Sequence, residues 1–162
     1  MLGSLVEPGA FSFQGYNRLV EKRIPDLESL ETEARSLVAS LAPTTHALLV
    51  TLSGELGAGK TTFTQLVARA LGIDEPVTSP TFVLEKIYEL EGQAFARLVH
   101  IDAYRLEGGQ ALKPLGFDDL YADPNNLILL EWPERVTDAL PTADISITLI
   151  ANDDGSRIMT YG

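Results

Sequence analysis

The chain has 162 residues, of which 45% are hydrophobic, and this length and composition predict one domain with a single core. Twelve basic residues against 23 acidic ones give a net charge of −11, which argues against nonspecific nucleic-acid binding because phosphate contacts need lysine and arginine. The chain has no cysteine, so disulfides and thiolate metal sites are excluded. No apolar run approaches the ~18 residues of a membrane span, and the first residues lack the pattern of a signal peptide. We therefore expect a cytoplasmic protein that makes no contact with a membrane.

The N-terminal part of the chain divides into an extension and the start of a domain. Residues 1–22 show no hydrophobic period, and we interpret them as an extension that is flexible in part. Residues 23–162 form the predicted domain, because no linker, repeat or low-complexity tract interrupts them. An amphipathic helix is expected over residues 26–41, with Asp26 as its N-cap and Pro43 beyond its end.

A strand, a glycine-rich loop and a helix follow in that order. Residues 47–52 read ALLVTL, a continuous apolar run that is typical of a strand covered on both faces. After the glycine-rich loop, residues 62–72 carry apolar side chains at helical spacing and end in glycine. After this helix we expect strands over 81–90 and 95–101, for which a hairpin is one interpretation. A short helical piece over 117–121 is expected in an otherwise irregular region, followed by a buried strand over 127–130 and a short helix that begins at Pro133. Residues 145–150 and 157–161 are expected to form a closing hairpin.

The glycine-rich loop matches a phosphate-binding pattern. Residues 54–61 read GELGAGKT and fit G-x-x-x-x-G-K-[ST] at every fixed position. In this pattern the backbone N–H groups and the start of the next helix point at phosphate oxygens. Lys60 can reach the β- and γ-phosphates, and Thr61 offers a hydroxyl to Mg²⁺. A plain glycine-rich turn is the alternative, but a buried strand before the loop and an amphipathic helix after it favour nucleotide binding.

Two apolar stretches end in an acidic residue, as the magnesium-binding strand of a P-loop protein does. RLVHID ends at Asp102, and LILLE ends at Glu131. Ligands of an open α/β sheet lie beyond the carboxyl ends of its strands, so both acids can converge on a metal and an attacking water. Strand-end carboxylates are also common as solvated caps. The sequence leaves open which of the two acids binds the metal directly.

Several other residues near these motifs have two interpretations. His100 is more often a core histidine than a catalyst, and Trp132 more often packs than shapes a contact with a partner. Tyr104 and Arg105 either contact a substrate or partner or form an amphipathic pair on a loop. Residues 78–81, TSPT, are either a turn or a loop that senses the γ-phosphate.

Four segments together resemble a known family. GELGAGKTTF, VTSPTF, HIDAYRL and LLEWPERV occur in the order and at the approximate spacing of the bacterial TsaE proteins, small ATPases of the tRNA threonylcarbamoyladenosine pathway. The resemblance covers residues 26–162 and leaves residues 1–22 outside. It implies an α/β fold, a single P-loop NTPase domain with a mixed, largely parallel central sheet flanked by helices.

The resemblance also implies an activity and partners. The expected activity is hydrolysis of ATP with Mg²⁺, weak in the isolated chain and coupled to the TsaD and TsaB proteins. Those two proteins transfer the threonylcarbamoyl group to adenosine of tRNA, so the present chain would meet tRNA only indirectly, through the complex.

The motif match carries specific roles onto this sequence. Thr61 and Glu131 resemble the Mg²⁺ ligands, and Asp102 resembles the acid that orients or activates water, so both acids are catalytic candidates. The implied nucleotide-binding residues are Thr32, Glu55, Leu56, Gly57, Ala58, Gly59, Lys60, Thr61, Thr62 and Arg157.

Two rival functions use the same loop. A small-molecule or nucleotide kinase usually has an arginine-rich lid, whereas the arginines after residue 70 are few and dispersed. A non-hydrolysing, ATP-dependent assembly switch is the second rival, and ATP binding without turnover would distinguish it. A GTPase is disfavoured because the sequence has no N-K-x-D motif.

Overall fold

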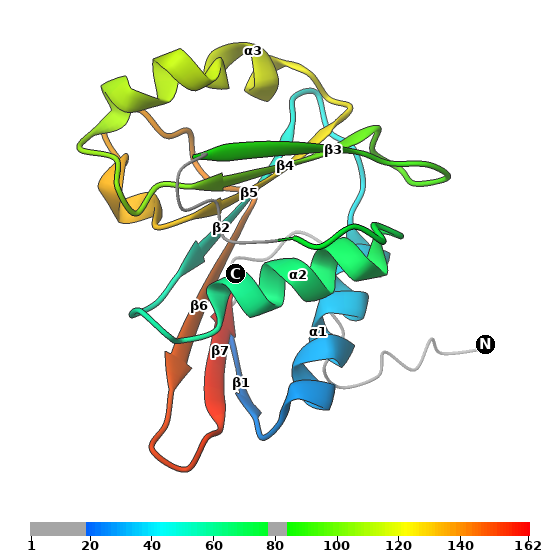
Figure 1. Ribbon diagram of the computed structural model, residues 1–162, viewed down its shortest axis with the longest axis vertical. Coiled ribbons are helices and arrows are strands. Elements are labelled where there is room, and N and C mark those ends of the chain that lie inside the picture. The colour runs from blue at the N-terminus through cyan, green and yellow to red at the C-terminus, as the bar shows by residue number, and fades with distance from the viewer. Residues whose placement is uncertain (1–18, 78–83) are drawn as a thin grey trace, which may run out of the picture.

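Over the described residues, 19–77 and 84–162 of a computed structural model, seven strands form one mixed sheet in the order β1-β7-β6-β2-β5-β4-β3 (Figure 1). The elements in chain order are β1 (Val20–Ile24), α1 (Leu27–Ser40), β2 (Leu48–Ser53), α2 (Lys60–Ala70), β3 (Glu85–Glu89), β4 (Arg97–Asp102), the 3₁₀ helix η1 (Gly109–Leu115), α3 (Phe117–Ala122), β5 (Asn126–Glu131), the 3₁₀ helix η2 (Pro133–Arg135), β6 (Ile145–Ala151) and β7 (Arg157–Tyr161).

The centre of the sheet is parallel and its two margins are antiparallel. Strands β6, β2, β5 and β4 run parallel, and the outer pairs β4–β3, β6–β7 and β7–β1 run antiparallel. Every residue of β5 is buried, as expected for a strand covered on both faces. The predicted mixed α/β sheet is confirmed. Because β2, β4 and β5 are parallel, their carboxyl ends meet at one edge.

Helices cover both faces of the sheet, so the core has two parts. On one face α1 and α2 pack beside each other, and their apolar side chains meet alternate residues of the strands, such as Leu98, Leu127 and Leu129. On the other face η1 and α3 cover the intervening residues, such as Val99 and Ile128. The two clusters follow directly from the alternation of side chains along each strand.

The first helix forms as its sequence predicts. The Asp26 carboxylate accepts a hydrogen bond of 2.8 Å from the Ser29 backbone N–H, which caps the helix N-terminus. The pKa of Asp26 is lowered by a hydrogen bond from the Ser29 hydroxyl and, next, by this backbone hydrogen bond. Leu30, Ala34 and Leu37 are fully buried against the core, so the apolar stripe of the sequence is the face that packs.

The predicted boundary between extension and domain falls inside a strand. β1 covers Val20–Ile24 and pairs antiparallel with β7, so the sheet already includes residues before 23. Lys22 forms an ion pair of 3.0 Å with Glu33, which ties this strand to α1. The sequence VEKRI is too short and too charged to predict a strand by itself, and its partner strand lies at the far end of the chain. The remainder of the predicted extension, up to residue 18, lies outside the described residues.

The other elements differ from prediction mainly at their ends. Both hairpins form, but β3 begins at Glu85, and residues 81–83 of the predicted strand lie outside the described residues. η1 is a 3₁₀ helix in a region that was expected to be irregular. None of the helices in the described part of the chain is long and apolar enough to cross a membrane.

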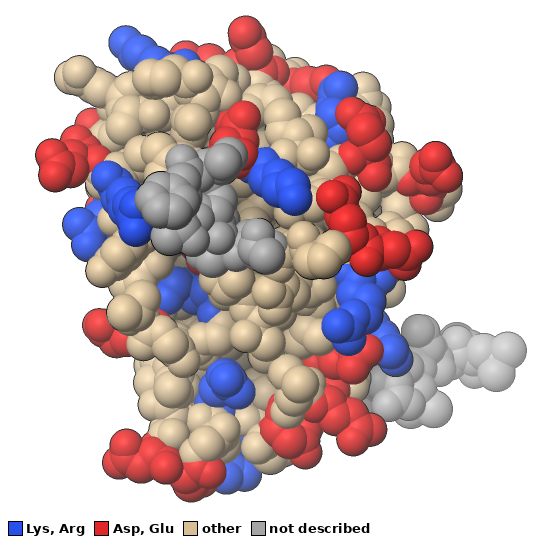
Figure 2. All heavy atoms as spheres, viewed as in Figure 1, with Lys and Arg blue, Asp and Glu red and all other residues tan. Residues whose placement is uncertain are grey.

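Charge is unevenly spread over the surface. On the face that Figure 2 shows, acidic side chains gather along the margins, whereas lysine and arginine side chains are scattered over both the margins and the middle of the face. This distribution fits the net charge of −11.

A substitution in β1 tests whether this strand belongs to the folded domain. Ile24 is 2% exposed and belongs to the core beneath α1, so Ile24→Ala should lower the free energy of unfolding by about 2–5 kcal/mol. The matched control is Arg23→Ala in the same strand, whose ion pair with Asp154 is exposed and should leave unfolding nearly unchanged. Denaturant unfolding measures both. An equal, small effect of the two changes would show that β1 does not contribute to stability.

Candidate functional site

The glycine-rich loop joins the carboxyl end of β2 to the first residue of α2. Within the loop, Ala58 N–H donates to Glu55 O (3.0 Å), and the bond from Phe63 N–H to Gly59 O (2.8 Å) is the first hydrogen bond of α2. Gly54 lies so close to β6 that a Cβ atom there would be 2.4 Å from the Leu149 carbonyl oxygen. The loop therefore presents the N-terminus of an eleven-residue helix at the edge where the parallel strands end, a geometry that suits an anion.

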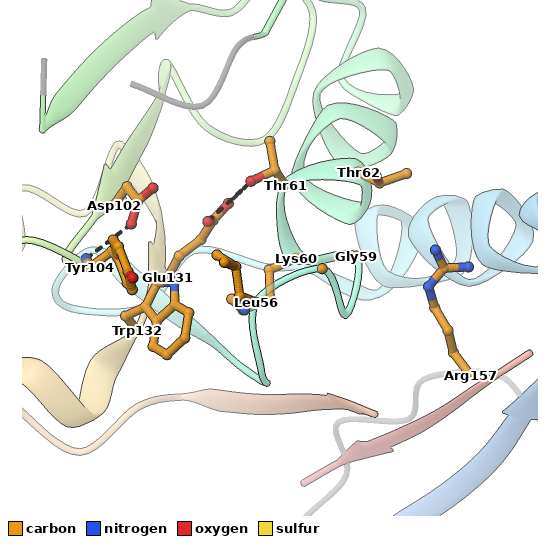
Figure 3. A pocket seen from close by; sticks show the side chains of 11 residues that line it. Leu56, Gly59, Lys60, Thr61, Thr62, Asp102, Tyr104, Glu131, Trp132 and Arg157 are labelled. Atoms are coloured by element: carbon orange, nitrogen blue, oxygen red, sulfur yellow. Dashed lines mark hydrogen bonds between the residues drawn. The ribbon is translucent and has the colours of Figure 1, made fainter. Parts of the chain in front are cut away.

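Lys60 is drawn back into this loop (Figure 3). Its ammonium group donates hydrogen bonds to the carbonyl oxygens of Gly54 (2.5 Å) and Glu55 (2.9 Å), and it lies 4.2 Å from the centre of the Trp132 ring. Only 5% of the residue is exposed. Burial lowers the pKa of the Lys60 ammonium, and nearby carboxylates, Glu131 first among them, oppose that effect. The loop thus holds a cation among acids.

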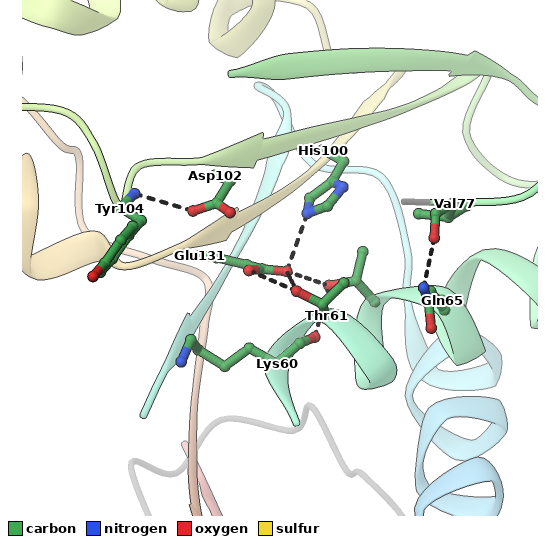
Figure 4. Close-up of polar contacts among 9 residues, drawn as sticks. Lys60, Thr61, Gln65, Val77, His100, Asp102, Tyr104 and Glu131 are labelled. Atoms are coloured by element: carbon green, nitrogen blue, oxygen red, sulfur yellow. Dashed lines mark hydrogen bonds and ion pairs between the residues drawn. The ribbon is translucent and has the colours of Figure 1, made fainter. Parts of the chain in front are cut away.

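Glu131 is a buried carboxylate at the end of β5, and side chains of α2 and β4 surround it (Figure 4). The Thr61 hydroxyl is 3.3 Å from both carboxylate oxygens, and the Thr64 hydroxyl is 3.3 Å from Oε1. His100 Nε2 is 3.1 Å from Oε1. Glu131 is 2% exposed, so these contacts replace the water that a charged carboxylate would otherwise have.

Asp102 stands at the end of β4 directly beside Glu131. The two residues are partners in the parallel register of β4 and β5, so their side chains lie on the same face of the sheet. One oxygen of Asp102 accepts a hydrogen bond of 3.0 Å from the Tyr104 backbone N–H. Asp102 is half-buried and therefore nearer to solvent than Glu131. The two strand-end acids meet as the sequence predicts.

Trp132 turns the chain sharply at the rim of this group. Its φ of 61° is the one positive value at a non-glycine residue within the described ranges, a conformation that costs about 1–2 kcal/mol. Its ring lies 4.9 Å from that of Tyr104, and the Arg135 guanidinium lies over both rings. The strained backbone thus places an aromatic ring over Lys60.

A pocket of about 270 Å³ opens in front of the loop (Figure 3). Its lining consists of Leu56, Gly57, Gly59, Lys60, Thr61, Thr62, Asp102, Tyr104, Glu131, Trp132 and Arg157. The sequence predicts all of these except Tyr104 and Trp132 as nucleotide-binding, metal-binding or catalytic residues. The structure brings them to one place, while their roles in binding and catalysis stay predictions.

Three predicted nucleotide-binding residues do not line the pocket. Thr32 is exposed on α1, and its hydroxyl donates to the Glu28 carbonyl oxygen (3.0 Å). Glu55 and Ala58 belong to the loop, but their carbonyl oxygens accept hydrogen bonds from Lys60 and from Arg157 Nε (2.9 Å). Arg157 reaches the loop from β7, and this contact fixes one side of the pocket. Residues 78–81 lie outside the described residues.

Sequence reasoning missed the part played by Thr64 and left His100 as a core residue. Thr64 follows Thr61 by one helical turn, so both hydroxyls face β5, and that spacing was the available signal. His100 precedes Asp102 by two residues and therefore shares its face of β4. No pattern along the chain indicates that this histidine contacts Glu131.

Comparison with known proteins places the chain in a family. The family model described as "Threonylcarbamoyl adenosine biosynthesis protein TsaE" matches residues 24–159. The chain belongs to the TsaE family. It thereby belongs to a family of tRNA threonylcarbamoyladenosine biosynthesis, and the resemblance drawn from the four motifs is confirmed.

Relatives cover most of this TsaE-family chain. The tRNA threonylcarbamoyladenosine biosynthesis protein TsaE of Haemophilus influenzae is 36% identical over 71% of this chain and 70% of its own length. The protein of the same name from Bacillus subtilis is 37% identical over 70% of this chain and 68% of its own length. The crystal structure of Bacillus subtilis YdiB superposes with a TM-score of 0.71 at 29% identity and covers 89% of this chain and 84% of that one.

Two glycines of the loop give a graded test of its geometry. Gly57 has a φ of 82° but open space around it, so Gly57→Ala should cost only the ~1–2 kcal/mol of a left-handed alanine. Gly54→Ala should lower the free energy of unfolding further, because its Cβ would meet the β6 backbone. Denaturant unfolding of both variants provides the comparison. Equal losses would mean that the close approach of the loop to β6 is not a constraint on stability.

Proposed function

We propose that this TsaE-family chain binds and hydrolyses ATP in support of tRNA threonylcarbamoyladenosine modification, and that its turnover depends on partner proteins. The observation that carries the proposal is the position of Lys60, Thr61 and Glu131 around one pocket at the N-terminus of α2. Backbone amides at a helix N-terminus and a lysine in the preceding loop are the recurring means of holding the phosphates of a nucleotide.

The residues present also fit Mg²⁺. This ion prefers oxygen ligands and is usually held by few carboxylates together with phosphate oxygens and water. The Thr61 hydroxyl and the Glu131 carboxylate, 3.3 Å apart, are oxygen donors of that kind, and we assign both as its protein ligands. When bound, the ion would offset the charge that develops on the phosphates.

Asp102 is assigned to the attacking water. It lines the same pocket, one strand away from Glu131, and is more accessible than that residue. A carboxylate at this place can orient a water molecule and accept its proton. We assign the two roles by burial. Glu131 is buried and lies against the Thr61 hydroxyl, whereas Asp102 is more accessible to solvent.

The partners in this proposal are TsaD-like and TsaB-like proteins, which would carry out the transfer to tRNA. Among the described residues that line the pocket, only Lys60 and Arg157 carry a positive charge, and the Lys60 ammonium is already engaged by the loop. A partner that closes over the pocket would exclude water and fix the acids, and trans-supplied groups raise turnover by ~10³ or more in other P-loop enzymes. The net charge of −11 favours a protein partner over direct contact with tRNA.

Removal of the loop cation tests nucleotide binding. Lys60→Ala should weaken ATP binding at least about tenfold, because a charge-assisted hydrogen bond contributes ~1.5–3 kcal/mol. Isothermal titration calorimetry measures this change. Lys113→Ala on η1, an exposed lysine outside the pocket lining, is the matched control and should bind ATP as the unmodified chain does. An unchanged affinity in the Lys60 variant would remove the loop from the proposed site.

Release of phosphate tests the dependence on partners. The isolated chain should turn over ATP slowly, and the rate should rise strongly only when TsaD-like and TsaB-like proteins are both added. Asp102→Asn and Glu131→Gln should lower the stimulated rate by ~10²-fold or more and reduce ATP binding much less.

Two results of that assay would replace the proposal. Fast turnover by the lone chain, or transfer of phosphate to a small molecule, would favour a kinase. Stoichiometric ATP binding without turnover in the presence of both partners would favour a non-hydrolysing assembly switch.

A further inference from the structure

His100 is a polar side chain at a core position of the sheet. It is fully buried in the middle of β4, and its neighbours on the same face include Leu98 and Leu129, which belong to the apolar cluster beneath α2. A leucine would fit the surrounding chemistry, whereas an imidazole there must find a hydrogen-bonding partner. Its partner is the Glu131 carboxylate (Figure 4).

The contact from His100 is the shortest that Glu131 makes with these side chains. Its Nε2 lies 3.1 Å from Oε1, whereas the hydroxyls of Thr61 and Thr64 lie 3.3 Å away. Thr64 has a single hydroxyl proton and also lies 3.0 Å from the Lys60 carbonyl oxygen, the better acceptor by distance. The Thr61 hydroxyl is the proposed metal ligand. Of these three donors, His100 therefore has the carboxylate as its nearest acceptor and is assigned no other role in the site.

The other ring nitrogen indicates which tautomer is present. His100 Nδ1 is buried and has no hydrogen-bond partner among the described residues. A hydrogen on Nδ1 would be left without an acceptor, whereas a hydrogen on Nε2 is satisfied by Oε1. The ring with hydrogen on Nε2 alone is the form that this environment supports, and it donates to Glu131.

We propose that His100 is a positioning residue that holds Oε1 of Glu131 so that Oε2 stays directed toward the pocket and the metal. The inference rests on the proposed role of Glu131 as a Mg²⁺ ligand. Within the described part of the chain, Oε2 has a hydrogen bond only with the Thr61 hydroxyl, so this oxygen lies on the side of the first turn of α2. Outer-shell partners of metal ligands act in this way, and their loss usually weakens metal binding by ~10–100-fold.

Three variants separate positioning from packing. The amide nitrogen of glutamine reaches about as far as Nε2, so His100→Gln can keep the donor to Glu131. His100→Asn places an amide near the position of Nδ1, where the structure shows no partner, and is the polar control. His100→Leu fills the core without any donor. ATP affinity is measured by calorimetry in chelator and across a Mg²⁺ titration, and thermal unfolding reports the stability of each variant.

The expected result is a change confined to the metal-dependent part of binding. His100→Leu and His100→Asn should need ~10–100-fold more Mg²⁺ to tighten ATP binding, with ATP affinity in chelator close to that of the unmodified chain. His100→Gln should lie near the unmodified chain. A purely structural histidine would instead change thermal unfolding in all three variants and leave the Mg²⁺ requirement unaltered.

The outcomes of the titration distinguish failure of this inference from failure of the proposed function. If the unmodified chain shows tighter ATP binding with Mg²⁺ and His100→Leu and His100→Asn show the same requirement, the positioning role is overturned and the metal site stands. If His100→Gln raises the Mg²⁺ requirement of ATP binding as much as His100→Leu does, the hydrogen-bond donor at Nε2 does not determine metal binding, and the inference is likewise overturned. If Mg²⁺ does not affect the unmodified chain, the metal role of Glu131 falls, and the role of His100 falls with it.

Discussion

The Glu131 carboxylate ends a fully buried strand and is itself 2% exposed. A charge removed from water in this way is strongly unfavourable unless hydrogen bonds and opposite charge replace the lost hydration. The replacements come from separate elements: hydroxyls from the first two turns of α2, an imidazole from β4 and the Lys60 ammonium nearby. The carboxylate can be buried here because the order of strands β2, β5 and β4 and the placement of α2 bring all of these groups within reach of it.

The same constraint connects the loop to the rest of the sheet. Burial alone would favour the neutral form of Lys60, and the surrounding acids oppose this, so the cation and the acids stabilise one another. The ammonium binds the carbonyl oxygens of its own loop and lies beneath the Trp132 ring. Close approach of Gly54 to β6 and of Arg157 to Ala58 fixes the loop from the other side. The loop is thus shaped by tertiary contacts as well as by its glycines.

Local patterns predicted most of the fold, and they failed where a strand is defined by its partner. The apolar runs of β2 and β5, the capped stripe of α1 and the glycine turn between β6 and β7 each carry their structure in a few neighbouring residues. β1 does not, because three charged residues between two apolar ones suit an exposed segment as well as an edge strand. Only pairing with β7 and burial of Ile24 decide between these two states.

The candidate site shows the same division. The sequence by itself determined the phosphate loop, the two strand-end acids and the family, because the spacing of the loop residues and the end of each apolar run are local properties. It did not determine that Asp102 and Glu131 are register partners, or that Thr64 and His100 contact the same carboxylate oxygen. Those contacts join residues on α2, β4 and β5, which are distant along the chain. Strand order and register alone decide which side chains of such elements meet, and both are set by the packing of the whole core.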